Sequence, residues 1–303
     1  MSAPARDTVA GRAYRDLQNK ARRESRPTDE LLSLYTLEGF LDRLAVSARS
    51  RDFVLKGGVL LAAYDLRRPT RDVDLQVSAM ANDAATILAL VNEIAGIERD
   101  DGLVYATGQS TAETIRDQDE YSAVRVSMGA SLATAQLRFH VDVNIGDPVS
   151  PTAKLVEVPK LLGGSISVRG YPLAMVLAEK IVTAVERGTA NTRWRDFADI
   201  YLLSRVHAVD GIVLARSLDV VANHRAAELA PSGEVLAGFP DLAQTRWAAW
   251  TRKQRLTDRL PMQFGEVLDA VTAFTDPVLR GQTEGQRWDP TRPGWRARPL
   301  ADS

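Results

Sequence analysis

The chain has 303 residues, of which 45% are hydrophobic and 25% charged, and its formal net charge is −1. This length suits two domains, and no stretch approaches the roughly 20 apolar residues that a membrane-spanning helix needs. The absence of cysteine excludes a disulfide framework, a thiolate zinc site and a cysteine nucleophile. The basic first segment lacks the apolar region of a secretory signal, so we expect a cytoplasmic location.

Helices are predicted at the start of the chain. Residues 1–26 carry seven basic and three acidic residues. They are predicted to form a solvated, partly frayed end, or alternatively an arm that contacts nucleic acid or a partner. The following helix has leucines three and four residues apart, at Leu31, Leu34, Leu37, Leu41 and Leu44. This spacing predicts one buried stripe, and we expect residues 1–50 to form N-terminal helices.

The next stretch combines a glycine pair with two aspartates. A short apolar strand precedes Gly57 and Gly58, and an apolar, helix-favouring run follows them, which predicts a strand-to-helix turn. Backbone N–H groups at such a turn attract phosphate, and glycine lets a ligand approach closely. After thirteen further residues come Asp72 and Asp74, one residue apart on a predicted strand, so their side chains share a face.

A third acidic strand residue follows. Alternation in the run from Leu137 to Ile145 places Asp142 on the same face as His140 and Asn144. Magnesium prefers carboxylate oxygen, so Asp72 and Asp74 are expected to hold a metal ion, while Asp142 completes a second metal site or acts as a base. The alternative is that the aspartate pair simply lies on a solvated strand. His140 is interpreted as a satisfied strand residue.

From residue 171 the pattern changes to helices. In this part Lys180 is either a phosphate ligand or half of a surface ion pair. Asp196 and Asp199, three residues apart on one helix face, either support the site or cap the helix and pair with neighbouring arginines. Helical character is expected over 171–280, and an irregular tail, packed down by tryptophans, over 281–303.

A late helix combines cations with two tryptophans. Its cations are Arg246, Arg252, Lys253, Arg255 and Arg259. Arginine neutralises phosphate and tryptophan stacks on exposed bases, which is how single-stranded RNA ends are held. Trp247 and Trp250 are alternatively core residues with the cations merely flanking them.

The ordered pattern of Gly57-Gly58, Asp72-Val73-Asp74 and Asp142 resembles that of the DNA polymerase β-like nucleotidyltransferase superfamily. Two later segments, Leu177 to Lys180 and Arg193 to Ile200, resemble the third and fourth motifs of the AbiEii/AbiGii (MenT-like) nucleotidyltransferase toxin family. The resemblance covers roughly residues 50–205. Arg195 stands where that family often has lysine.

The resemblance implies an α+β fold, with a mixed sheet flanked by helices in a nucleotidyltransferase core at 51–170 and a C-terminal helical domain at 171–280 completing the site. It implies a Mg²⁺-dependent toxin that adds nucleotides from an NTP to the tRNA 3′ acceptor end, with a possible antitoxin partner. The implied catalytic residues are Asp72, Asp74, Asp142, Lys180, Asp196 and Asp199, the first three as metal ligands. The implied nucleotide-binding residues are Gly57, Gly58, Thr70, Lys180 and Arg195.

Two other functions are kept as alternatives. One is a small-molecule nucleotidyltransferase acting on an antibiotic-type hydroxyl, and the other is a non-catalytic module that binds an antitoxin or nucleic acid. Thr70, set among arginines and two residues before Asp72, is also a hypothetical phosphorylation site that controls the protein. The sequence contains no Gly-x-Ser-x-Gly elbow, so serine hydrolase chemistry has no support.

Overall fold

The computed structural model describes residues 7–77, 83–116 and 122–298. The predicted start of one strand at Tyr121, and both extreme ends of the chain, lie outside these residues. Two compact units make up the chain: Met1–Asp147 with Ala153–Tyr171 (unit 1), and Pro148–Thr152 with Pro172–Ser303 (unit 2). Among the helices described, none is long and apolar enough to cross a membrane.

The described part of unit 1 contains an eight-stranded mixed sheet with the order β3-β5-β6-β2-β1-β8-β7, in which β4 also pairs with β5. The pairs β2·β6 and β1·β8 are parallel, and the others are antiparallel. The strands are β1 (Phe53–Lys56), β2 (Asp72–Val77), β3 (Leu103–Tyr105), β4 (Thr111–Arg116), β5 (Ser122–Leu132), β6 (Ala135–Ile145), β7 (Lys154–Pro159) and β8 (Ser165–Gly170). The mixed sheet confirms the predicted α+β class.

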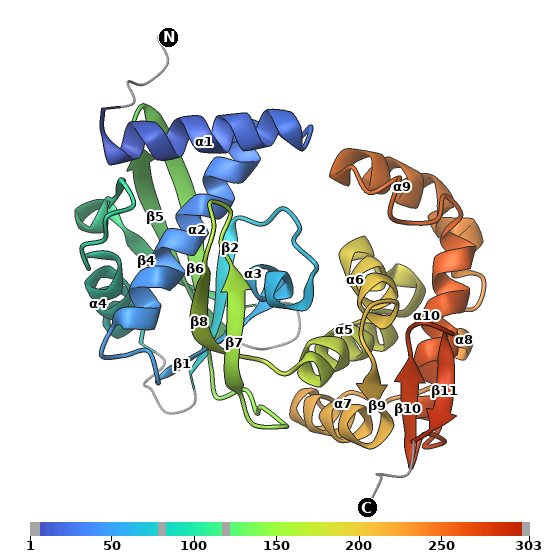
Figure 1. Cartoon of the computed structure of the whole chain (residues 1–303). Coiled ribbons are helices and arrows are strands. Elements are labelled where there is room, and N and C mark those ends of the chain that lie inside the picture. The colour runs from blue at the N-terminus through green and yellow to red at the C-terminus, as the bar shows by residue number, and fades with distance from the viewer. Residues whose placement is uncertain (1–6, 78–82, 117–121, 299–303) are drawn as a thin grey trace, which may run out of the picture. The chain divides into compact units, whose positions relative to one another are not determined.

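Helices cover one face of this sheet. The longest is α2 (Thr28–Val46), which crosses β6 and β8, and α1 (Val9–Arg23) packs on α2 (Figure 1). The ring of Phe40 on α2 lies 6.0 Å from that of Phe139 on β6. Since side chains alternate along a strand, Asp142 of β6 must point to the opposite face. The remaining helices of unit 1 are α3 (Gly57–Leu60), η1 (Leu61–Tyr64), α4 (Ala84–Ala95) and η2 (Thr107–Gln109).

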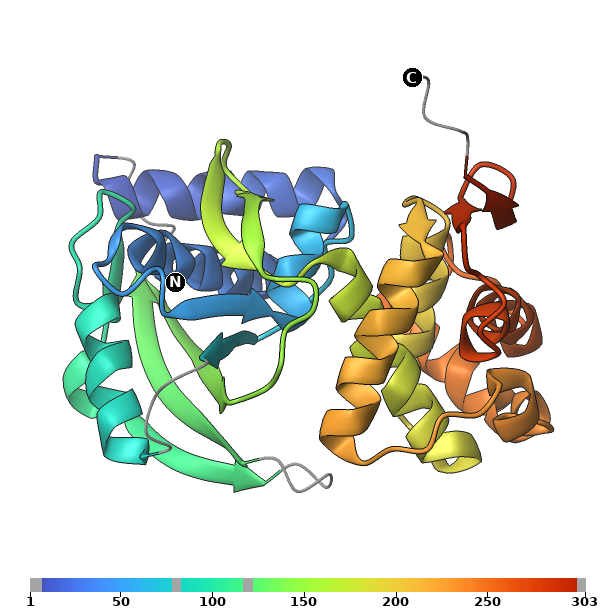
Figure 2. The same ribbon diagram turned by 90° about the horizontal axis from the view of Figure 1, so that it is seen from below.

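Unit 2 is built mainly from helices packed around an aromatic core. Helix α5 contacts α6 and α7, and α10 contacts α6 (Figure 2). The rings of Phe197 and Phe264 meet edge to face at 5.4 Å. The helices are α5 (Leu173–Arg187), η3 (Gly188–Ala190), α6 (Trp194–Ser204), α7 (Gly211–Arg225), α8 (Ser232–Val235), α9 (Phe239–Gln254) and α10 (Phe264–Leu279).

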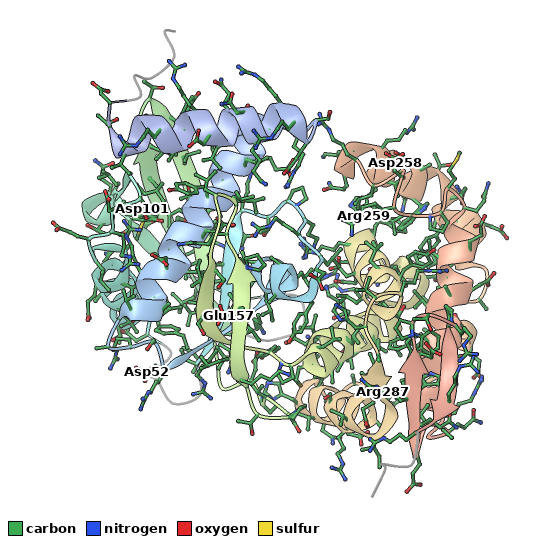
Figure 3. All side chains as sticks on the ribbon, viewed as in Figure 1. Asp52, Asp101, Glu157, Asp258, Arg259 and Arg287 are labelled. Atoms are coloured by element: carbon green, nitrogen blue, oxygen red, sulfur yellow. The ribbon has the colours of Figure 1, made fainter. Side chains whose placement is uncertain are left out.

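The tail is not irregular as predicted. Strands β10 (Gln286–Asp289) and β11 (Gly294–Ala297) form an antiparallel hairpin, and β10 also pairs with β9 (Val209–Asp210) (Figure 3, where Arg287 lies on β10). The predicted tryptophan packing is confirmed: Trp288 is 3% exposed and its ring lies 4.9 Å from that of Phe274. These strands are too short for a recognisable alternation, and packing on α10 stabilises them.

Candidate functional site

The turn between β1 and α3 is shaped around one carboxylate. Gly57 has a φ of +67°, and a Cβ at this position would lie 1.8 Å from Oδ2 of Asp74. Only glycine therefore fits. The N–H of Gly58 donates to the same Oδ2 at 3.3 Å. The predicted strand-to-helix turn is present, and in this structure its glycines position Asp74.

Four charged residues lie side by side across four strands, and we call them the charged row. Asp74 of β2 is the register partner of Asp142 on the parallel strand β6. Lys56 of β1 is the register partner of Asp74, and Arg125 of β5 is the register partner of Asp142. Asp72 lies two residues from Asp74 on the same face, opposite His140. The structure therefore brings together the three aspartates that were predicted to act together.

The two central carboxylates of the row have different surroundings. Asp142 is 7% exposed and accepts two hydrogen bonds from Arg125, from Nε to Oδ1 at 2.8 Å and from a terminal nitrogen to Oδ2 at 2.6 Å. Burial raises the pKa of Asp74 above its ordinary value, and the charge of Asp142 raises it further, against the opposing effect of Lys56. Lys56 forms an ion pair with Asp147, with its Nζ 2.8 Å from Oδ2. The row thus holds two adjacent carboxylates that repel each other.

Within the described residues, no group of three or more histidine, aspartate or glutamate side chains is placed to hold a metal ion. The donor set nevertheless fits a hard divalent cation, because Asp72, Asp74 and Asp142 offer carboxylate oxygens on adjacent strands. Each oxygen of Asp142 accepts one hydrogen bond from Arg125 and keeps a second lone pair. The metal-binding role of the three aspartates stays a prediction.

The loop before β2 is anchored from α2. Thr70 Oγ1 lies 3.4 Å from both the backbone nitrogen and the backbone oxygen of Asp72, which closes a small turn ahead of the acidic strand. Buried Glu38 forms an ion pair with Arg67 and accepts the N–H of Leu161 at 2.9 Å. Desolvation raises the pKa of Glu38 although Arg67 opposes it. Sequence reasoning missed Glu38, whose only signal is an acidic residue inside an apolar helix.

In unit 2, Lys180 is clamped by two aspartates. Its Nζ lies 3.1 Å from Asp196 Oδ1 and 2.6 Å from Asp199 Oδ2, and the lysine side chain is 13% exposed. Arg193 Nε donates to the other oxygen of Asp196 at 2.8 Å. Burial acts to raise the pKa of Asp196, but the cations Lys180 and Arg193 outweigh it, so the pKa is lowered. The aspartates therefore form a buried ion pair with Lys180 rather than a surface one, while Arg195 is exposed.

The late basic helix corresponds to α9 and the turns that follow it. Its five cations are all exposed (Figure 3 labels Arg259 beyond α9). Trp247, however, is completely buried and donates from Nε1 to the carbonyl of Pro261 at 3.1 Å. Trp250 is half-buried and stacks on it, with ring centroids 5.4 Å apart. Trp247 is thus a core residue, which leaves the cations and the outer side of Trp250 at the surface.

Two residues of the charged row, Lys56 and Arg125, were not singled out from the sequence. Lys56 directly precedes the glycine pair, which was a signal that could have been used. Arg125 carries no such signal, because its partner on β6 is set by strand pairing. His140 matches its interpretation as a satisfied strand residue, with Nδ1 at 2.9 Å from Ser127 Oγ.

Comparison with known proteins gives one family and several similar folds. The family model "Nucleotidyl transferase AbiEii toxin, Type IV TA system" matches residues 39–277. No curated protein matches the chain. MenT4, a nucleotidyltransferase toxin from Mycobacterium tuberculosis, is 16% identical, with 88% of this chain and 98% of that chain covered and a TM-score of 0.51. JHP933 from Helicobacter pylori is 14% identical, with coverages of 82% and 92% and a TM-score of 0.48.

Proposed function

Because the chain belongs to the AbiEii family of nucleotidyltransferase toxins of type IV toxin-antitoxin systems, we propose that it adds nucleotides from an NTP to the 3′ acceptor end of tRNA in a Mg²⁺-dependent reaction. The observation that carries this proposal is the charged row, in which Asp74 and Asp142 are direct partners on adjacent strands. Carboxylates held next to each other repel, and this repulsion would favour binding of a divalent cation.

The reaction proposed is attack of a terminal ribose hydroxyl oxygen on the α-phosphorus. The bond from that phosphorus to the bridging oxygen breaks, pyrophosphate leaves, and the hydroxyl proton is released to solvent. Asp72, Asp74 and Asp142 would hold the metal. A bound divalent metal stabilises the charge that develops on the phosphate oxygens. Each oxygen of Asp142 keeps one lone pair beside its hydrogen bond from Arg125, and that lone pair can serve a metal ion.

Lys180 is proposed to bind the triphosphate. A lysine has three N–H donors, and two of them are directed at Asp196 and Asp199. The third remains for a phosphate oxygen. The two aspartates therefore act on Lys180 by fixing its position, which reduces the entropy lost when it binds the nucleotide.

An RNA acceptor is favoured by the exposed cations of α9 and the turns after it. Arginine and lysine side chains at a surface neutralise the phosphates of a nucleic acid. Trp250, half-buried at the same surface, offers a ring on which an unpaired base can stack. A small-molecule acceptor would have no use for such a surface.

The proposal is tested by incubating the protein with Mg²⁺, each labelled NTP in turn, and total tRNA, with EDTA and the Asp74→Asn variant as controls. Label at the tRNA 3′ end that disappears in both controls supports the proposal. Label only on a small acceptor indicates a small-molecule nucleotidyltransferase. Absence of transfer from every NTP indicates a binding module without turnover.

A further inference from the structure

Arg125 holds Asp142 by both of its oxygens. The guanidinium donates to Oδ1 at 2.8 Å and to Oδ2 at 2.6 Å, and the two residues are directly paired on antiparallel strands. This two-bond geometry is the strongest that an ion pair between side chains adopts. The contact raises the pKa of Arg125, whose guanidinium also lies in the field of Asp72. Arg125 is therefore bound directly to one carboxylate of the charged row.

Asp142 needs such a partner when no metal is bound. It is buried, and its register neighbour Asp74 carries a second carboxylate one strand away, a strand spacing of about 4.8 Å. A buried carboxylate beside another is costly unless a cation compensates it. Arg125, which forms an ion pair with Asp142, supplies this compensation, and Lys56 at the other end of the row forms an ion pair with Asp147.

We propose that Arg125 is an internal counter-ion, which fixes Asp142 in the metal-free protein and competes with a divalent metal for the same carboxylate oxygens. This inference rests on the proposed function. Arg125 is a positioning residue, since it acts through Asp142.

The competition has a physical basis in two effects. The guanidinium takes one lone pair on each oxygen of Asp142, which restricts the directions from which a metal can approach. The positive charge of Arg125 also repels a metal cation that approaches Asp142. Partial burial of the ion pair weakens the screening of this repulsion by solvent. Arg125 therefore weakens binding of the metal alone. Tight binding then requires the phosphates of the nucleotide, which add their own charge and oxygens.

The experiment uses the full chain, freed of metal with a chelator, and Mn²⁺ as the probe. Binding is measured by calorimetric titration without NTP, and the midpoint of thermal unfolding is measured with EDTA and with Mn²⁺. The variants are Arg125→Met, which removes the charge, and Arg125→Lys, which keeps the charge but cannot form the two parallel guanidinium hydrogen bonds. Arg138→Met is the matched control, because Arg138 is exposed on β6 and shares the face of Asp142.

For Arg125→Met we expect Mn²⁺ affinity to rise on the order of tenfold, since the competing charge is gone. Its unfolding midpoint in EDTA falls, and Mn²⁺ raises it more than in the unmodified protein. Arg125→Lys shows a smaller rise in affinity, and Arg138→Met shows none. If Arg125→Met does not fold, the Arg125→Met, Asp142→Asn double variant restores stability by removing the unpaired carboxylate, and Arg125→Lys carries the affinity test.

The possible failures are distinguishable. If the unmodified protein binds Mn²⁺ but neither Arg125 variant binds it more tightly, the counter-ion inference is wrong while the proposed function stands. If the unmodified protein binds no Mn²⁺ with or without NTP, the metal site of the proposed function is wrong and the inference falls with it. An equal gain of affinity in Arg138→Met also overturns the inference, because the effect would then be one of general surface charge.

Discussion

The charged row of unit 1 and the Lys180 clamp of unit 2 are built from the same residue types with opposite results. On β2 and β6, Asp74 and Asp142 face each other, and burial together with that like charge raises the pKa of Asp74. On α5 and α6, Asp196 and Asp199 face a lysine, and the cations outweigh burial and lower the pKa of Asp196. The adjacent carboxylates of the charged row favour binding of a further cation. The aspartates of the Lys180 clamp instead hold a cation of the chain itself in place.

The largest effect is expected where like charges meet. Asp74→Asn should lower transfer activity by on the order of 10²–10³-fold, as for removal of another group that stabilises transition-state charge. It should leave the metal-free protein at least as stable, because an amide of the same shape removes the repulsion with Asp142. Activity assays and thermal unfolding in EDTA measure both effects.

Asp52→Asn is the matched control for this prediction, since Asp52 is an exposed aspartate in unit 1 (Figure 3). It should change neither quantity. A variant at Asp74 that keeps more than about a tenth of the activity would show that this carboxylate does not serve the reaction, and the contrast between the two clusters would lose its functional meaning.

A substitution in the Lys180 clamp should instead change mainly the stability of the protein. Lys180→Met removes the cation that buried Asp196 and Asp199 share, so it should cost about 3–5 kcal/mol of unfolding free energy. Adding Asp199→Asn to that variant should recover part of the loss. Urea unfolding followed by circular dichroism provides the measurement.

Lys253→Met on α9 is the control, because that lysine is exposed. We expect it to change stability by less than about 0.5 kcal/mol. A loss below about 1 kcal/mol for Lys180→Met would mean that the clamp behaves like a surface ion pair, in contradiction to the burial of both aspartates.

The charged row shows what could be predicted from the sequence and what could not. Strand alternation has a period of two, so the common face of Asp72 and Asp74 follows from local geometry. The pairing of Asp74 with Asp142 depends on the register of two distant strands, and the contact of Arg125 with Asp142 depends on a third. The α+β class and the family follow from motifs that lie within single segments.

Unit 2 follows the same rule. The spacing of Asp196 and Asp199 predicted that they are neighbours, whereas their shared partner Lys180 comes from another helix and appears only when α5 packs on α6. The hairpin of the tail was missed because its stability comes from contacts of Trp288 and Trp295 with Phe274. Local patterns predict faces and neighbours, and tertiary packing decides which partner a charge meets.

A rise in pH should change the contributions of two buried carboxylates to stability in opposite directions. These are Glu38 in unit 1 and Asp196 in unit 2. Desolvation raises the pKa of Glu38 above 4.5, so its contribution to stability is present below that value and is lost as the pH rises through the folded pKa. The pKa of Asp196 is lowered below 3.8, so its contribution is present above that value and is lost as the pH falls through the folded pKa.

Calorimetric unfolding from about pH 3 to pH 8 tests these signs in the variants Glu38→Gln and Asp196→Asn. Relative to the unmodified protein, Glu38→Gln should become more stable as the pH rises, and Asp196→Asn should become less stable as the pH rises from the acid end. Parallel curves for either variant would show that the carboxylate concerned does not titrate differently in the folded chain.

The smallest effects are expected at the exposed cations of α9 and at Arg255, which caps its C-terminus. These cations should be more sensitive to salt than the charged row and the Lys180 clamp. Arg252→Gln and Arg255→Gln should each weaken RNA binding and reduce the slope of log affinity against log salt by about 0.7 for a single strand. Arg292→Gln, at an exposed arginine of the β10–β11 hairpin, should leave the slope unchanged. Fluorescence anisotropy with a labelled RNA 3′ end over a range of salt concentrations measures the slope.

Salt also separates this surface from the clamp. Exposed charges are screened over about 8 Å at physiological ionic strength, while the Lys180 cluster is buried. Raising the salt should therefore weaken RNA binding while leaving the stability cost of Lys180→Met nearly constant. Equal slopes for all three arginine variants would place the RNA contact elsewhere on the protein, because a cation that touches phosphate cannot be removed without releasing fewer counter-ions.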